Sequence, residues 1–150
     1  GYGSDMSSLG PPFDENMAYS FHFYNTYPHV DNIQRYIALR QEWNRPFWVG
    51  EFGEDGNRTH YACVKRLLET ENIGWGFWTW KRYHSEGRVL YDYPVPDGLY
   101  SVLEGNAGGS AQGTLTEFLG SVHFSRCTAN SDTLDALVYN PNRCDWDTGN

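Results

Sequence analysis

The stretch that decides the fold is PFWVGEFG, residues 46–53. Its first half is continuously apolar, which is typical of a strand that is covered on both faces, and Pro46 opens it. Glu51 follows this apolar run, between Gly50 and Gly53. A carboxylate there is costly to desolvate unless it has a partner or faces a cleft. The stretch therefore predicts a buried strand that ends either in a functional carboxylate or in an ion pair with a nearby Arg or Lys.

Two similar runs lie on either side of this strand. Residues 17–24 (MAYSFHFY) form a short aromatic run with strand propensity, and residues 73–80 (IGWGFWTW) are apolar throughout. Residues 32–43 and 59–70 carry apolar side chains at helical spacing, and Asp31 is placed to cap the first of these helices. Apolar strands that alternate with helices predict a parallel sheet with right-handed crossovers.

The spacing of the strand ends narrows the fold class. His22, Glu51 and Trp78 mark the carboxyl ends of the three strands, with separations of 29 and 27 residues. A (β/α)₈ barrel of about 250 residues spends roughly 31 residues on each unit. The expected fold is therefore α/β, as a partial (β/α)₈ TIM barrel of three strands with their helices. Residues 81–110 are predicted to be irregular, and residues 113–124 and 134–138 to be helical.

Polar and aromatic side chains gather at the strand ends, where active sites of parallel α/β barrels lie. By the two-residue period of a strand, His22 and Tyr24 share a face with Ser20 and alternate with Phe21 and Phe23. An imidazole and a phenol that point the same way could bind a carboxylate or a sugar hydroxyl. The alternative is a core histidine that is satisfied by a neighbour.

Trp78 and Trp80 share one face near the end of the third strand. An indole at the mouth of a barrel offers a flat surface to a pyranose ring. The alternative is packing inside the barrel, which we assign to Trp75 and Phe77.

Composition sets the class of partner. Aromatic residues make up 17% of the 150-residue chain, which suits a groove for sugar rings as well as a core. The net charge is −8, and the 11 basic residues are scattered, so nucleic acid and anionic membrane surfaces are poor candidates. No apolar run approaches the roughly 18 residues of a membrane span.

Three cysteines leave at least one without a partner in the chain. Cys63 lies in a helical pattern and is expected to be a buried thiol. Cys127 and Cys144 could pair in an oxidising compartment. Their spacing matches no metal motif, and neither a metal nor another cofactor is expected.

Three blocks, FHFY (residues 21–24), WVGEFG (48–53) and GWGFWTWK (74–81), resemble strands 6, 7 and 8 of glycoside hydrolase family 5, the cellulase-type (β/α)₈ barrels. The resemblance implies retaining hydrolysis of a β-glucan-type polysaccharide or oligosaccharide, as in an endo-β-1,4-glucanase. Relatives that act on β-mannan or β-1,3-glucan share these motifs and remain alternatives. Tyr83, Tyr91, Tyr93 and Tyr100 of the irregular stretch are candidates for contacts with further sugar residues.

The resemblance also implies roles for single residues. Glu51 corresponds to the catalytic nucleophile, and His22 and Tyr24 to the pair that orients it and lines the −1 subsite. Trp78 corresponds best to the platform under the −1 sugar, with Trp80 second. A retaining mechanism needs a second carboxyl group, as acid and base, about 5–5.5 Å from the nucleophile.

In the family that acid/base stands in an Asn-Glu pair on strand 4, and this chain has no match for it. We therefore expect residues 1–150 to be the C-terminal fragment of a single catalytic domain that lacks the N-terminal half of its barrel. Such a fragment is expected to be inactive alone, and the alternative is a non-catalytic carbohydrate-binding fragment. The full-length parent is expected to be secreted.

Overall fold

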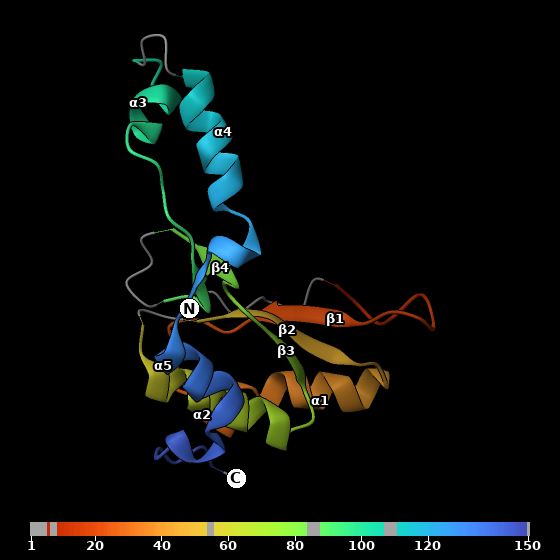
Figure 1. Cartoon of the computed structure of the whole chain (residues 1–150). Helices are drawn as coiled ribbons and strands as arrows, with labels where there is room; N and C mark the ends of the chain where they lie inside the picture. The colour runs from red at the N-terminus through yellow and green to blue at the C-terminus, as the bar shows by residue number, and fades with distance from the viewer. Residues whose placement is uncertain (1–5, 7–8, 54–55, 84–87, 107–110, 150) are drawn as a thin grey trace.

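The computed structural model describes residues 6, 9–53, 56–83, 88–106 and 111–149. Its centre is a parallel sheet of β1 (Tyr19–His22), β2 (Phe47–Phe52) and β3 (Gly74–Phe77), paired in that order. Helix α1 (Gln34–Trp43) connects β1 to β2, and α2 (Arg58–Thr70) connects β2 to β3 (Figure 1). The chain is therefore α/β, with the expected strand–helix–strand–helix–strand order, and its described strands form an open sheet that closes no barrel.

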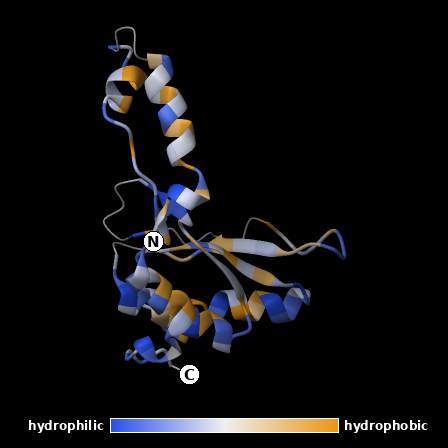
Figure 2. Ribbon diagram, viewed as in Figure 1, coloured by the Kyte–Doolittle hydropathy of each residue, from blue (hydrophilic) through white to orange (hydrophobic). Residues whose placement is uncertain are grey.

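Helices cover one face of this sheet, and the core lies between them (Figure 1). Phe21 of β1 stacks on Tyr36 of α1, with ring centroids 3.7 Å apart. Phe77 of β3 meets the buried Tyr61 of α2 edge to face at 4.9 Å. Figure 2 places hydrophobic residues along this layer between strands and helices. Burial of large aromatic rings is the main stabilising term for such a small sheet.

On the opposite face of the sheet, no helix of the described residues covers the strands (Figure 1). Ser20 and Trp48 point to it, and both are exposed, with 46% of the Trp48 surface open to solvent. The Trp48 ring lies against Gly74 of the neighbouring strand, so closely that a Cβ at that glycine would be 2.3 Å from it. The alternation predicted for β1 is confirmed: Phe21 and Phe23 are buried on the helix side, and Ser20 is exposed.

The first helix begins later than the sequence predicts. Asp31 is not its cap but lies in a preceding turn of 3₁₀-helix, η2 (Val30–Asn32), and Ile33 precedes the first residue of α1. Helix α2 begins after Asn57, whose side chain accepts a hydrogen bond from the His60 backbone N–H. This Asn57 cap satisfies one of the free amide groups at the start of a helix.

The prediction of one long strand at residues 73–80 is wrong in its second half, because β3 ends at Phe77. The chain then enters a small second sheet of β4 (Lys81–Arg82), β5 (Tyr91–Asp92) and β6 (Thr128–Ala129). Two of these two-residue strands, β4 and β5, interrupt the stretch that we predicted to be irregular.

Helices α3 (Leu99–Leu103) and α4 (Ala111–Ser121) connect β5 to β6 and stand away from the main sheet (Figure 1). We call residues 93–106 and 111–127 the arm. Sequence patterns missed α3, which is only five residues long and begins after Gly98 at φ 79°. The helix predicted at residues 113–124 corresponds to α4.

The chain returns from the arm to pack against α2. Helix α5 (Ser131–Leu134) continues directly into a π-helix, η4 (Asp135–Tyr139), and a 3₁₀ turn, η5 (Pro141–Arg143), follows. Ala136 and Leu137 of η4 are buried in the core. None of the helices in the described ranges is long and apolar enough to cross a membrane.

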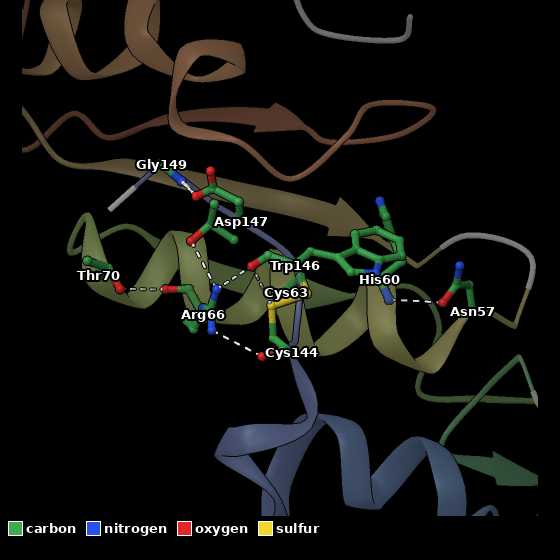
Figure 3. Close-up of a disulfide and its surroundings, with 10 residues drawn as sticks. Asn57, His60, Cys63, Arg66, Thr70, Cys144, Trp146, Asp147 and Gly149 are labelled. Carbon is green, nitrogen blue, oxygen red and sulfur yellow. Dashed lines mark hydrogen bonds between the residues drawn. A yellow bond between two sulfur atoms is a disulfide. The ribbon is translucent and has the colours of Figure 1, made fainter.

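A disulfide joins Cys63 of α2 to Cys144, the first residue of the segment 144–149 that we call the tail (Figure 3). The expectation that Cys63 is a buried thiol is therefore wrong, and the pairing of Cys127 with Cys144 that the sequence left open does not form, because Cys127 is the free cysteine. Spacing along the sequence could not reveal this pair, because 81 residues separate its members and only the return of the chain across α2 brings them together.

The tail makes further contacts beside the disulfide (Figure 3). Arg66 of α2 donates hydrogen bonds to the backbone oxygens of Cys144, at 3.1 Å, and Trp146, at 2.6 Å. The Trp146 ring stacks on the Tyr27 ring, with centroids 5.4 Å apart. The backbone N–H of Val30 donates to the main-chain carbonyl oxygen of Thr148 at 2.9 Å. The tail thus links α2 to the loop that follows β1.

Candidate active site

Backbone pairing brings the carboxyl ends of β1, β2 and β3 to one edge of the sheet. The pairing continues past the end of β1, where the backbone N–H of Phe23 donates to the main-chain carbonyl oxygen of Glu51 at 2.9 Å. It also continues past the end of β3, where the Trp78 N–H donates to the Phe52 oxygen at 2.8 Å. The residues predicted from the sequence at the strand ends are therefore held by main-chain hydrogen bonds on both sides of β2.

A bulge in β2 sets the direction of the Glu51 side chain. Phe21 pairs with Val49, but the next residue of β1, His22, pairs with Glu51, so β2 uses two residues where β1 uses one. Strict alternation would place Glu51 on the same face as Val49, against the helices. The extra residue instead keeps Glu51 on the open side, while Phe52 turns into the core and is fully buried. Bulges commonly redirect side chains in this way next to active sites.

Gly50 leaves the space that this arrangement needs. A Cβ at position 50 would lie 2.7 Å from the Ser20 Oγ and 3.4 Å from the His22 ring. The first of these distances is far inside van der Waals contact, so a side chain here would displace its β1 neighbours. A glycine inside a strand is the one sequence signal that indicates such a bulge or close approach.

The Glu51 carboxylate is held by two side chains of the segment that carries β1. The Tyr24 hydroxyl donates a hydrogen bond to Oε2 at 3.2 Å, and the His22 Nδ1 lies 3.5 Å from the same oxygen. The carboxylate side chain remains 30% exposed, so it is open to an incoming group. The structure thus brings Glu51 together with His22 and Tyr24, a pair that lies 27 or more residues earlier in the sequence.

Trp78 lies at the same edge, directly after β3. Gly53 follows the end of β2 with φ 138°, and a Cβ there would be 2.4 Å from the Trp78 carbonyl oxygen. Only glycine fits a backbone conformation and a contact of this kind. The peptide bond between Trp78 and Thr79 is cis. The indole itself is 54% exposed, which leaves much of its surface open to a ligand.

Trp80 differs from Trp78 in its surroundings. Its ring stacks on Phe124, with centroids 5.7 Å apart and planes 21° apart, and meets Tyr91 edge to face at 6.5 Å. The Lys81 ammonium also lies 5.4 Å from its ring centroid. The structure therefore places Trp80 at the base of the arm, and Phe124 covers part of one face of its ring.

The site combines an anchored, partly exposed carboxylate with an exposed indole. Neither Tyr24 nor His22 is a carboxylic acid, and the described residues show no carboxyl group hydrogen-bonded to Glu51. The arrangement suits attack by a carboxylate on a ligand that packs flat against Trp78.

Comparison with known families gives one match. Residues 2–84, more than half of the chain, match the family model for cellulase, glycosyl hydrolase family 5. The matched range contains all three strands of the main sheet and all five predicted site residues, whereas α3, α4 and the tail lie beyond it. No match was found among curated proteins.

Proposed function

The chain belongs to glycosyl hydrolase family 5, and from this premise we propose that its site cleaves the O-glycosidic bonds of a β-glucan-type polysaccharide with retention of configuration. The observation that carries the proposal is the position of Glu51, at the end of β2 and in contact with Tyr24 and His22. Membership of the family supports hydrolysis of glycosidic bonds in general, and the substrate and the roles of single residues are our proposal.

In the proposed mechanism Glu51 is the nucleophile. Tyr24 and His22 both contact Oε2 of Glu51, which leaves Oε1 to attack the anomeric carbon. As this bond forms, the bond between the anomeric carbon and the leaving oxygen breaks. A hydrogen bond from Tyr24 stabilises the ionised carboxylate and fixes its orientation. Trp78 supports the sugar ring that is attacked, and water then releases the glycosyl group from Glu51.

The acid/base carboxyl group is proposed to come from further β/α units that complete the barrel, in which β1, β2 and β3 take the places of strands 6, 7 and 8. Two observations support a companion of this kind. No helix of the described residues covers the face that carries Trp48 (Figure 1), and three strands leave two open edges. A hollow of about 550 Å³ at the amino end of the sheet, lined by Trp48, Arg40 and Arg45 among others, extends this uncovered surface.

The disulfide between Cys63 and Cys144 supports a secreted protein. Disulfides persist in oxidising compartments and are rare in the cytosol. We therefore propose that the enzyme acts outside the cell, where polysaccharide is found.

A second candidate function is binding of carbohydrate without cleavage. It is favoured because the sequence has no match for the Asn-Glu pair that carries the acid/base in the family. Exposed Trp78 would then act as a stacking surface alone.

An activated 2-fluoro glycoside separates the two functions, because its good leaving group departs without an acid. The folded chain should form a covalent adduct on Glu51, located by mass spectrometry of its peptides. Glu51→Gln should form none, and Glu42→Gln, an exposed glutamate on α1, should react like the wild type. Absence of any adduct from the folded wild-type chain would count against Glu51 as nucleophile and favour the binding function.

A further inference from the structure

The arm carries a set of aromatic rings that the proposed reaction does not use. At its base, Tyr83 lies 5.9 Å from Tyr93 and 6.2 Å from Tyr100, and Tyr93 lies 6.2 Å from Phe118 of α4. Trp80, Tyr91 of β5 and Phe124 form a second cluster beside the small sheet, with Tyr91 and Phe124 at 4.7 Å.

These rings lie at the active-site end of the main sheet. Trp78 directly follows the carboxyl end of β3, and β4 begins only a few residues later, so the base of the arm continues from that edge (Figure 1). Both clusters contain exposed rings, Trp80 and Phe124 in one and Tyr100 in the other, and the exposed Trp78 precedes Trp80 by two residues. Phe124 and Tyr100 are each 49% exposed, so about half of the surface of each of these large aromatic side chains is open to solvent.

Charge and chemistry limit what the rings can bind. Residues 93–127 include three acidic residues and one basic residue, which disfavours an anionic ligand. A hydrogen bond with Tyr83 raises the pKa of Tyr100, and burial raises the pKa of Tyr93, so both phenols stay neutral at ordinary pH. Neutral phenols beside flat rings offer both stacking and hydrogen bonds, which suits a neutral, hydroxyl-rich chain better than a purely apolar partner.

We propose that the arm is an extended binding surface for a neutral polysaccharide, in which Phe124 and Tyr100 hold sugar residues beyond those at Trp78. This inference rests on the proposed function and adds a preference for long chains over short ones. It concerns a part of the molecule that lies outside the residues matched by the family, since that match ends at residue 84.

Affinity electrophoresis in gels that contain hydroxyethyl cellulose or glucomannan, both neutral polymers, tests the surface. The wild-type chain should be retarded, and Tyr100→Ala and Phe124→Ala should each weaken binding about fivefold or more, the usual effect of truncating an aromatic anchor. Tyr100→Phe keeps the ring and should retain most of the binding. Tyr139→Ala removes a 70% exposed tyrosine from η4, against α2, and should bind like the wild type.

A parallel reaction with the activated 2-fluoro monosaccharide separates this inference from the proposed function. In Tyr100→Ala the binding of polymer should fall much more than the rate of labelling at Glu51, because a monosaccharide does not reach the arm. The inference is overturned if Tyr100→Ala and Phe124→Ala bind polymer like the wild type, or if the wild type is labelled but binds neither polymer. Binding of polymer without any labelling would instead retain the arm surface and reject Glu51 as nucleophile.

Discussion

Gly50 and Glu51 form a β-bulge, in which two residues of β2 lie opposite one residue of β1. This bulge directs the Glu51 carboxylate away from the core. The residue types at the site could be predicted from the sequence, since Glu51, His22 and Tyr24 all stand at strand ends. The direction of Glu51 could not, because a two-residue period assigns it to the helix side and only the bulge reverses that assignment. The contact between Tyr24 and Glu51 depends on this reversal.

Gly50→Ala should disturb the site more than the fold. The new methyl group would lie 2.7 Å from the Ser20 Oγ, so the Ser20 side chain must rotate away, and it would pack against the His22 ring at 3.4 Å. We expect the rate of labelling by the 2-fluoro glycoside to fall about threefold, since the methyl group crowds the imidazole beside Glu51 and small displacements of catalytic groups have large effects on rate. Gly113→Ala, in open surroundings on α4, is the control and should leave labelling unchanged.

Tyr24→Phe removes the hydroxyl that donates to Glu51 while it keeps the ring. A hydrogen bond to a charged group is worth about 1.5–3 kcal/mol, and the partial exposure of this carboxylate favours the lower value. Labelling of Glu51 should therefore slow about tenfold, with little change in the urea midpoint of unfolding. An unchanged labelling rate would show that Tyr24 does not support the nucleophile.

At the scale of elements, the tail and α2 form a unit that is closed by a covalent bond. The disulfide between Cys63 and Cys144 spans 81 residues, and Arg66 adds two hydrogen bonds to tail oxygens. Cross-linking a loop of this length removes conformational entropy that is equivalent to about 4–5 kcal/mol of stability.

Reduction of the disulfide, or replacement of Cys144 by Ser, should lower the free energy of unfolding by about 4 kcal/mol. Urea unfolding with and without reductant measures this difference. Cys127→Ser changes the one free cysteine of the described residues and should leave both curves in place. If reductant does not affect the wild-type curve, the tail is held by its hydrogen bonds and ring contacts alone.

The tyrosines at the base of the arm predict a dependence on high pH. The pKa of Tyr100 and that of Tyr93 are raised above 10.0, so the folded state holds these protons more tightly than the unfolded state. Their contribution to stability is present below pH 10 and is lost as pH rises through the raised values. Tyrosinate absorbance should show late-titrating phenols, one fewer of them in Tyr100→Phe, and thermal unfolding should occur at lower temperature above pH 10.

The elements that the sequence predicted well are those with a strong period. The continuous apolar run that starts at Phe47 predicted β2, residues 47–52, and apolar side chains at helical spacing predicted α2, residues 58–70. Short elements carry no such signal, so α3 and the two-residue strands of the second sheet were missed. The disulfide was missed because it depends on where the tail returns, which is a property of the tertiary structure.

At the scale of the whole molecule, the main sheet has α1 and α2 on one side, and on the other side Trp48 is exposed (Figure 1). An exposed sheet face that carries Trp48 and is flanked by two open strand edges is a surface that associates with other chains. A companion set of β/α units and a second copy of this chain would compete for it.

The isolated chain should therefore self-associate with rising concentration, and Trp48→Asp should reduce that association by placing a charge on the open face. Sedimentation velocity over a range of concentrations measures the effect. Val138→Asp places the same charge at an exposed position of η4, against α2, and should associate like the wild type. A cooperative 17.2 kDa monomer at all concentrations would contradict the prediction.

The bond between Cys63 and Cys144 also gives the chain a ring topology. The ring includes β3, the second sheet and the whole arm, so a single cut of the backbone anywhere within it opens the ring and separates nothing. A protease that nicks the arm would leave a molecule that migrates as one band without reductant and as two bands with it. Polysaccharide-degrading environments are rich in proteases, and in this topology the arm, which stands away from the rest of the molecule, can be cleaved without loss of either half.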